Sequence, residues 1–305
     1  MVTYIIRRLI EGFFTFLGVS ALVFILGRVT GDPIRLMVPE TATQEQRQEV
    51  RERLGLDKPI LVQYGVFLSN LAHGDLGRSY LRQEDVSTMV ISRMPATLEL
   101  ALSSMLISIV IAVPLGVFVA LKRNTPWDLL GSTLALIGQA TPNFWFGMVL
   151  IIFFAVELKW LPISGRGTFA QLILPSVTLS AASVGYFTRL VRSSMLDVLG
   201  QDYMRTARSK GATERSILVR HGLKNALIPV ITMMGMQFGS VLTGTFIVET
   251  VFAWPGIGRL GVNSLFERDF PVIQGVIILS SAVFVLSNLV VDLLYLVIDP
   301  RIRLD

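Results

Sequence analysis

The chain has no cysteine and only two histidines among its 305 residues. The absence of thiols excludes a disulfide framework, an iron–sulfur cluster and a thiolate zinc site. His73 and His221 are too far apart in the sequence to suggest a histidine-rich metal centre, so we predict no metal site. Charged residues make up 16% of the chain, against roughly 25% in ordinary globular domains. This composition argues against a soluble protein.

Apolar residues, in contrast, make up 52% of the chain and gather in long runs. A helix needs about 20 such residues to cross a hydrocarbon core that is about 30 Å thick. Runs of this kind lie at residues 9–28, 97–121, 132–157, 172–191, 228–248 and 274–296. They are continuous rather than alternating, and backbone groups in lipid must be paired within their own segment. We therefore predict an all-α integral membrane protein with about six transmembrane helices.

Two prolines lie inside these runs, Pro114 in the second and Pro142 in the third. Because proline lacks the amide donor and its ring clashes with the preceding turn, the second and third spans should bend or break there.

The basic residues of the short connections predict the orientation. An even number of spans puts both termini on one side, together with Lys122, Arg123 and a basic segment from Arg189 to Lys224. We expect this side to be cytoplasmic. The net charge of +5 is then largely explained by topology rather than by nucleic-acid binding.

The 31–93 segment should lie outside the cell. Helix formers fill residues 43–55, and Gly55 is suited to end that helix. Residues 60–72 form a second, amphipathic pattern with Tyr64, Phe67, Leu68 and Leu71 on one face. The segment is either a cap over the outer ends of the spans or part of a docking surface for an external protein.

The cytoplasmic 192–228 segment predicts a helix, a glycine turn and a second helix. Asp202 can cap the first helix, Gly211 can take the left-handed conformation that ends it, and Thr213 can cap the second. The small Ala207 would permit close approach of another chain. This unit is too polar for lipid and too short to fold alone, so it needs a partner; a basic loop resting on anionic lipid is the alternative.

The same loop carries a resemblance to a known family, in two runs: Asp202-Tyr203-Met204-Arg205-Thr206-Ala207-Arg208-Ser209-Lys210-Gly211 and His221-Gly222-Leu223-Lys224-Asn225-Ala226-Leu227-Ile228-Pro229. They resemble the cytoplasmic EAA loop of binding-protein-dependent ABC importer permeases, specifically the first permease subunit of the peptide/nickel group. Nearly the whole chain is similar in register, including Tyr4-Ile5-Ile6-Arg7-Arg8-Leu9, Gly74-Asp75-Leu76-Gly77, Trp254-Pro255-Gly256-Ile257-Gly258 and Asp299-Pro300-Arg301-Ile302-Arg303. The general EAA pattern has Glu at the position of Arg205 and a shorter distance from Gly211 to Pro229, and the peptide group shares both departures.

The resemblance implies the architecture and the partners. It implies a MetI-like (ABC transmembrane type-1) permease fold, divided into an N-terminal transmembrane helix at 1–30, an extracytoplasmic segment at 31–93, a permease core at 94–298 and a cytoplasmic tail at 299–305. The implied partners are a second homologous permease, two cytoplasmic ATPases and an extracytoplasmic substrate-binding protein in a prokaryotic cell membrane. The implied ATPase-coupling residues are Asp202, Tyr203, Thr206, Ala207, Lys210, Gly211 and Glu214.

The chain lacks the G-x-x-x-x-G-K-[ST] phosphate-binding loop. If ATP drives transport, ATP and Mg are bound by partner subunits, and this chain is a non-catalytic subunit with no cofactor. An inverted repeat and a buried acidic ion site would favour a secondary transporter, and no clear repeat is present. A membrane enzyme is a poor match, because no H-E-x-x-H motif or catalytic triad lies within the spans.

Candidates for the translocation pathway or gate are Glu249, Gln237, Met233 and Asn143. Glu249 ends the fifth span beside Trp254-Pro255-Gly256, and could form an outer gate or contact a substrate amine. The alternatives are pairing between helices for Glu249 and plain helix packing around the methionines. The implied substrate is a short peptide, with a nickel complex or glutathione as alternatives within the family.

Overall fold

The computed structural model describes residues 2–29, 34, 43–53 and 55–298, and these residues form helices without a strand. Helices long and apolar enough to cross a membrane are Ile6–Arg28, Val86–Leu121, Phe169–Leu199, Glu214–Leu242 and Phe270–Val290. A sixth span results if the bent pair Pro126–Ala140 and Asn143–Glu157 is counted as one. The predicted all-α fold with about six spans is confirmed.

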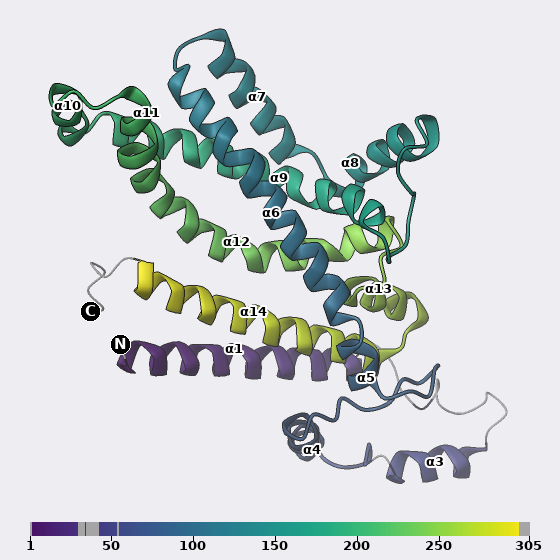
Figure 1. Ribbon diagram of the computed structural model, residues 1–305. Coiled ribbons are helices and arrows are strands. Elements are labelled where there is room, and N and C mark those ends of the chain that lie inside the picture. The colour runs from purple at the N-terminus through teal and green to yellow at the C-terminus, as the bar shows by residue number, and fades with distance from the viewer. Residues whose placement is uncertain (1, 30–33, 35–42, 54, 299–305) are drawn as a thin grey trace. The chain divides into compact units, whose positions relative to one another are not determined.

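The chain divides into two compact units (Figure 1). Unit 1 comprises residues 1–96 and 255–286, with α1 (Val2–Val29), α3 (Gln44–Arg53), α4 (Ile60–Ala72), α5 (Val86–Ile91), α13 (Ile257–Glu267) and most of α14 (Phe270–Ile298). Unit 2 comprises mainly residues 97–254, with α6 (Met94–Leu121), α7 (Pro126–Ala140), α8 (Asn143–Leu150), η1 (Ile151–Glu157), α9 (Phe169–Leu199), α10 (Asp202–Ser209), α11 (Glu214–Ser216), η2 (Ile217–Leu223) and α12 (Lys224–Val251).

In unit 1, α1 and α14 lie side by side and antiparallel (Figure 1). Gly12 faces Val285 and Gly27 faces Gln274, and the absence of side chains at these glycines lets the helices approach closely. α4 packs on α1 through its predicted apolar face. The Tyr64 hydroxyl lies 2.9 Å from the Ser20 hydroxyl, and the ring of Phe24 contacts both Tyr64 and Phe67.

The connection after α4, residues 74–85, is fastened to the turn between α13 and α14. Asp269 is 1% exposed; its carboxylate accepts hydrogen bonds from the Ser79 hydroxyl at 2.5 Å and the Tyr80 amide at 3.2 Å. A more exposed ion pair joins Arg82 to Glu267 at 3.0 Å. These bonds fix the position of the 74–85 connection relative to the α13–α14 turn.

In unit 2, α9 is the central helix, and α7, α8 and α12 pack on it. A Cβ at Gly185 would collide with the Ala135 carbonyl of α7, and one at Gly116 of α6 would lie 2.7 Å from the Thr188 carbonyl. The α7–α9 pair is also joined by a two-point ion pair, in which Arg192 donates to both carboxylate oxygens of Asp128 at 2.7 and 2.8 Å.

The two prolines have different effects. At Pro142 the third span turns through 105° between α7 and α8, so the predicted 132–157 span is not a straight helix. α6, however, is unbroken through Pro114, and the break considered there does not occur. Two residues later, the absence of a side chain at Gly116 lets α6 pack closely on α9.

Candidate functional site

The predicted coupling loop of unit 2 folds as a short helix, a glycine turn and a second helix that continues into α12. Gly211 follows α10 with φ +77°, and no atom lies within 4 Å of the position that its Cβ would take. The Ala212 amide closes the turn by donating to the Ala207 carbonyl at 3.2 Å. The left-handed glycine predicted from the sequence is therefore confirmed.

Of the two N-caps predicted for this loop, one is confirmed and one is wrong. Thr213 caps the second helix, because its hydroxyl oxygen accepts a hydrogen bond from the Ser216 amide at 3.4 Å. The cap predicted for the first helix is wrong: Gln201 holds the N-cap position, and Asp202 is the first helical residue. The Asp202 carboxylate lies 3.6 Å from Arg205 instead. The negative charge of Asp202 in the first turn of α10 is still favourable, because it lies at the positive end of the helix dipole.

A buried apolar joint at Met204 helps to attach α10 to the rest of unit 2. Met204 is fully buried, whereas most of α10 is exposed. A Cβ at Gly222 in η2 would lie 3.6 Å from the Cε atoms of both Met204 and Met195, the latter in α9. Ile217 is buried as well. Sequence reasoning missed this apolar joint, because a single methionine in a polar segment has no periodicity to reveal it.

The other predicted coupling residues are arranged around this joint. Thr206, Lys210, Gly211 and Glu214 are exposed, Tyr203 is 42% exposed and Ala207 is half-buried. Arg208 and Glu214 form an ion pair of 3.1 Å across the turn, and the Asn225 amide donates to the Tyr203 hydroxyl at 3.1 Å. The loop thus presents a mostly basic, solvent-accessible surface on a defined backbone.

Three of the four pathway candidates lie on or beside one face of α12. At about 100° per residue, Met233, Gln237 and Gly244 share one face of the helix. Asn143, at the start of α8, lies beside this face, because its side-chain nitrogen is 3.9 Å from the Cβ position of Gly244. Met233, Gln237 and Asn143 are half-buried. Met233 and Gln237 therefore share the α12 face that Asn143 borders at Gly244, about three and two helical turns before that glycine.

Glu249 is separate from this face. It is fully buried, and its carboxylate accepts a hydrogen bond from the Thr97 hydroxyl at 2.6 Å. A carboxylate in this state is not open to a substrate, so the arrangement favours helix pairing over direct contact. Thr97 is a further residue that the sequence did not identify.

The sequence matches two family models. Residues 112–304 match the binding-protein-dependent transport system inner membrane component, and residues 1–101 match the N-terminal part of such membrane components. Among curated proteins, the glutathione transport system permease protein GsiC of Escherichia coli (strain K12) is 45% identical over 304 residues, covering 99% of each chain. The protein of the same name from Salmonella typhimurium (strain LT2) is equally similar, with the same coverage.

Solved structures show the same fold at lower identity. An inward-facing form of the MetNI methionine ABC transporter superposes with a TM-score of 0.61 and 19% identity, covering 69% of this chain and 96% of that one. An amino acid ABC transporter crystallised with histidines gives a TM-score of 0.53 over 68% and 94% of the two chains.

Proposed function

The chain belongs to the family of binding-protein-dependent transport system inner membrane components, and we propose that it is the permease subunit of an ATP-driven importer that carries a short peptide into a prokaryotic cell. The full-length match to glutathione transport permeases is the observation that carries this proposal. Glutathione is itself a short peptide, so these relatives favour a peptide over a nickel complex.

In this proposal the α10–η2 loop couples ATP hydrolysis to transport. Its exposed residues would contact a cytoplasmic ATPase, while buried Met204 would pass the movement of α10 to α9 and η2. Such coupling requires an element whose position both sites bias, and a short helix on an apolar joint meets this requirement.

The remaining parts of the proposal concern organisation. Both termini would be cytoplasmic, the 31–93 segment extracytoplasmic, and residues 94–298 the permease core between an N-terminal helix at 1–30 and a tail at 299–305. The partners would be a second homologous permease, an external binding protein and two ATPases that hold ATP and Mg. Met233, Gln237 and Asn143 would line the pathway, and Glu249 would brace its wall through Thr97.

The absence of native cysteine permits a direct test of the coupling loop. Thr206→Cys and Lys210→Cys each introduce one exposed thiol on the proposed contact surface, and Lys122→Cys is a control after α6. With a short bifunctional thiol reagent in native membranes, the two loop variants should cross-link to an ATPase subunit identified by mass. Equal cross-linking of the Lys122 variant, or none from the loop, would refute the proposed contact.

The substrate requires a transport assay. The tagged chain is purified in mild detergent with its accompanying subunits, reconstituted with the binding protein, and supplied with labelled glutathione, a dipeptide or nickel. We expect ATP-dependent accumulation of one of the peptides. A chain that purifies alone and moves solute without ATP would be a secondary transporter instead.

A further inference from the structure

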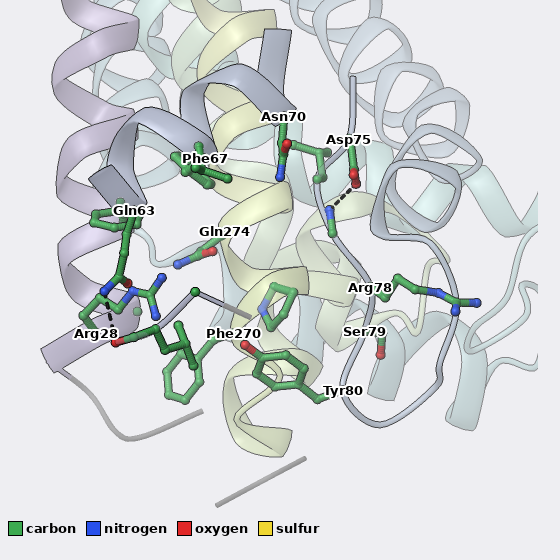
Figure 2. A pocket seen from close by; sticks show the side chains of 18 of the residues that line it. Arg28, Gln63, Phe67, Asn70, Asp75, Arg78, Ser79, Tyr80, Phe270 and Gln274 are labelled. Carbon is green, nitrogen blue, oxygen red and sulfur yellow. Dashed lines mark hydrogen bonds between the residues drawn. The ribbon is translucent and has the colours of Figure 1, made fainter. Parts of the chain in front are cut away.

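A cavity of about 610 Å³ lies within unit 1 and has no part in the proposed coupling or pathway (Figure 2). It lies between the end of α1, α4, the 74–85 connection and the start of α14. Its volume is within the roughly 300–1,000 Å³ that is typical of small-ligand sites. Phe24, Phe67 and Phe270 provide aromatic walls.

Two cations border this cavity without an ion-pair partner among the residues that the structure describes. Arg28 is half-buried, and its guanidinium carbon lies 5.0 Å from the centroid of the Phe24 ring. Lys58 is exposed at the rim. Arg78, by comparison, is already paired with Asp85 at 3.3 Å. Because partial burial of an unpaired guanidinium costs free energy, the cavity is suited to an anion at Arg28.

Tyr80 adds an unused donor. Its hydroxyl makes no hydrogen bond within the described part of the chain, and it lies on the side of the cavity that Phe270 occupies in Figure 2. Burial raises the pKa of Tyr80 above its ordinary value, although the charge of Arg28 opposes this rise. The hydroxyl therefore stays protonated at physiological pH and can donate to an anion.

Two carboxylates, Asp75 and Glu52, also line the cavity. In Figure 2, Asp75 lies across the cavity from Arg28. One Asp75 oxygen accepts the Gly77 amide at 2.8 Å, which leaves the other for a ligand. A molecule that carries an anionic and a cationic group would match this arrangement.

The cavity also lies where an apolar surface gives way to a polar one. The candidate span of α1 ends at Arg28, and Ile25 and Leu26 just before it are 51% and 50% exposed. On α4, Ile60 and Leu61 are exposed as well. Exposed apolar side chains followed by an arginine are typical of the boundary between lipid tails and headgroups.

We propose that this cavity binds the headgroup of a phospholipid from the leaflet on the side of the 31–93 segment, with Arg28 and Lys58 on its phosphate. Asp75 would face the ammonium of an ethanolamine group, and the aromatic walls would contact the glycerol and the first methylenes. This site does not depend on which solute the protein transports.

The test counts retained lipid on the full chain, purified with its accompanying subunits and analysed by native mass spectrometry. Wild type, Arg28→Gln and Lys58→Gln are compared, and Arg268→Gln is the matched control, because Arg268 is exposed in the α13–α14 turn and does not line the cavity. Wild type and the control should retain one more phosphatidylethanolamine than Arg28→Gln after delipidation. Lys58→Gln, whose side chain is exposed, should bind added lipid roughly tenfold more weakly, as expected for one lost charged contact.

Competitors identify the source of the anion. Glycerophosphoethanolamine should displace the retained lipid, whereas inorganic phosphate should do so only at much higher concentration. Equal lipid counts in all four proteins would overturn the proposal. So would binding of phosphate or a tripeptide at Arg28 without any lipid retention.

Discussion

The coupling loop of unit 2 and the 74–85 connection of unit 1 are both short polar segments, and they are held in opposite ways. α10 is attached by the packing of one fully buried side chain, Met204, and by exposed polar contacts of Tyr203 with Asn225 and of Arg208 with Glu214. The 74–85 connection is attached by hydrogen bonds to one buried carboxylate, Asp269. Apolar packing has no preferred direction, whereas a hydrogen bond weakens steeply when its angle changes.

This difference separates two mechanical roles. A helix whose buried contact is a methionine can tilt, since Met side chains adapt to irregular spaces and water can replace the partners of exposed polar groups. A loop bonded to a buried carboxylate cannot shift without stranding a charge. We infer that the coupling loop is built to move and that the 74–85 connection is built to keep its register.

The largest expected effect comes from changing the backbone conformation of the Gly211 turn in the coupling loop. Gly211→Val places a β-branched residue at φ +77°, and for L-residues the left-handed region costs roughly 1–2 kcal/mol. Because nothing lies within 4 Å of the new Cβ, backbone strain alone would redirect the turn. We expect roughly tenfold or greater loss of peptide uptake, with ATP hydrolysis uncoupled from transport.

Gly211→Asn is the control for this change, because Asn tolerates the left-handed conformation and should keep most of the uptake. Both are measured in membrane vesicles that contain equal amounts of protein. Normal uptake by Gly211→Val protein at the wild-type level would refute a coupling role for the turn.

The next effect comes from loosening the apolar joint. Met204→Ala removes a fully buried side chain, a change that costs about 2–5 kcal/mol in well-packed cores. α10 would detach locally, so uptake should fall several-fold while the protein remains in the membrane and ATPase activity persists. Met204→Leu keeps the volume and should behave almost as wild type. Met236→Ala, at a position 56% exposed, controls for methionine loss in general. Equal uptake by the Met204→Ala and Met236→Ala variants would contradict a specific role of Met204 in attaching α10.

The sequence predicted well those features that depend on local chemistry. The apolar runs identified the spans, Gly211 and Thr213 identified the turn and its cap, and Pro142 identified the break after α7. Each follows from a few adjacent residues. Asp202 was misplaced by one position, because several neighbouring polar residues can serve as an N-cap.

Features that join distant parts of the chain could not be predicted in this way. Ser79 and Asp269 are 190 residues apart, and Thr97 and Glu249 are 152 apart, so no local pattern connects them. Pro114 shows the same limit, because α6 continues through it as one helix although proline is unfavourable in a helix interior. Pro142 likewise predicts a break in the third span but not the 105° angle between α7 and α8.

A third, smaller effect tests the fixed connection. Asp269→Asn keeps the shape but removes the charge that strengthens the bonds from Ser79 and Tyr80, with an expected cost of about 1–3 kcal/mol. Unit 1 should unfold at a lower temperature in detergent, and uptake should fall less than with Met204→Ala. Ser79→Ala is combined with Asp269→Asn in a double-mutant cycle. The double variant should lose less than the sum of the single losses, because both changes act on the same Ser79–Asp269 bond. Strict additivity would mean that the carboxylate acts through another contact.

The smallest expected effect on stability comes from the exposed ion pair between Arg82 and Glu267. Arg82 and Glu267 link the same two segments as Ser79 and Asp269, but their side chains are 31% and 39% exposed. An ion pair in contact with water contributes only about 0–1 kcal/mol, because solvent screens the charges and two long side chains lose freedom. Arg82→Gln should therefore change thermal stability by a few degrees at most, and the change should shrink as salt is raised. If Arg82→Gln cost as much as Asp269→Asn, burial would not be what holds the 74–85 connection. The contrast with the mobile coupling loop would then rest on the number of polar contacts rather than on their environment.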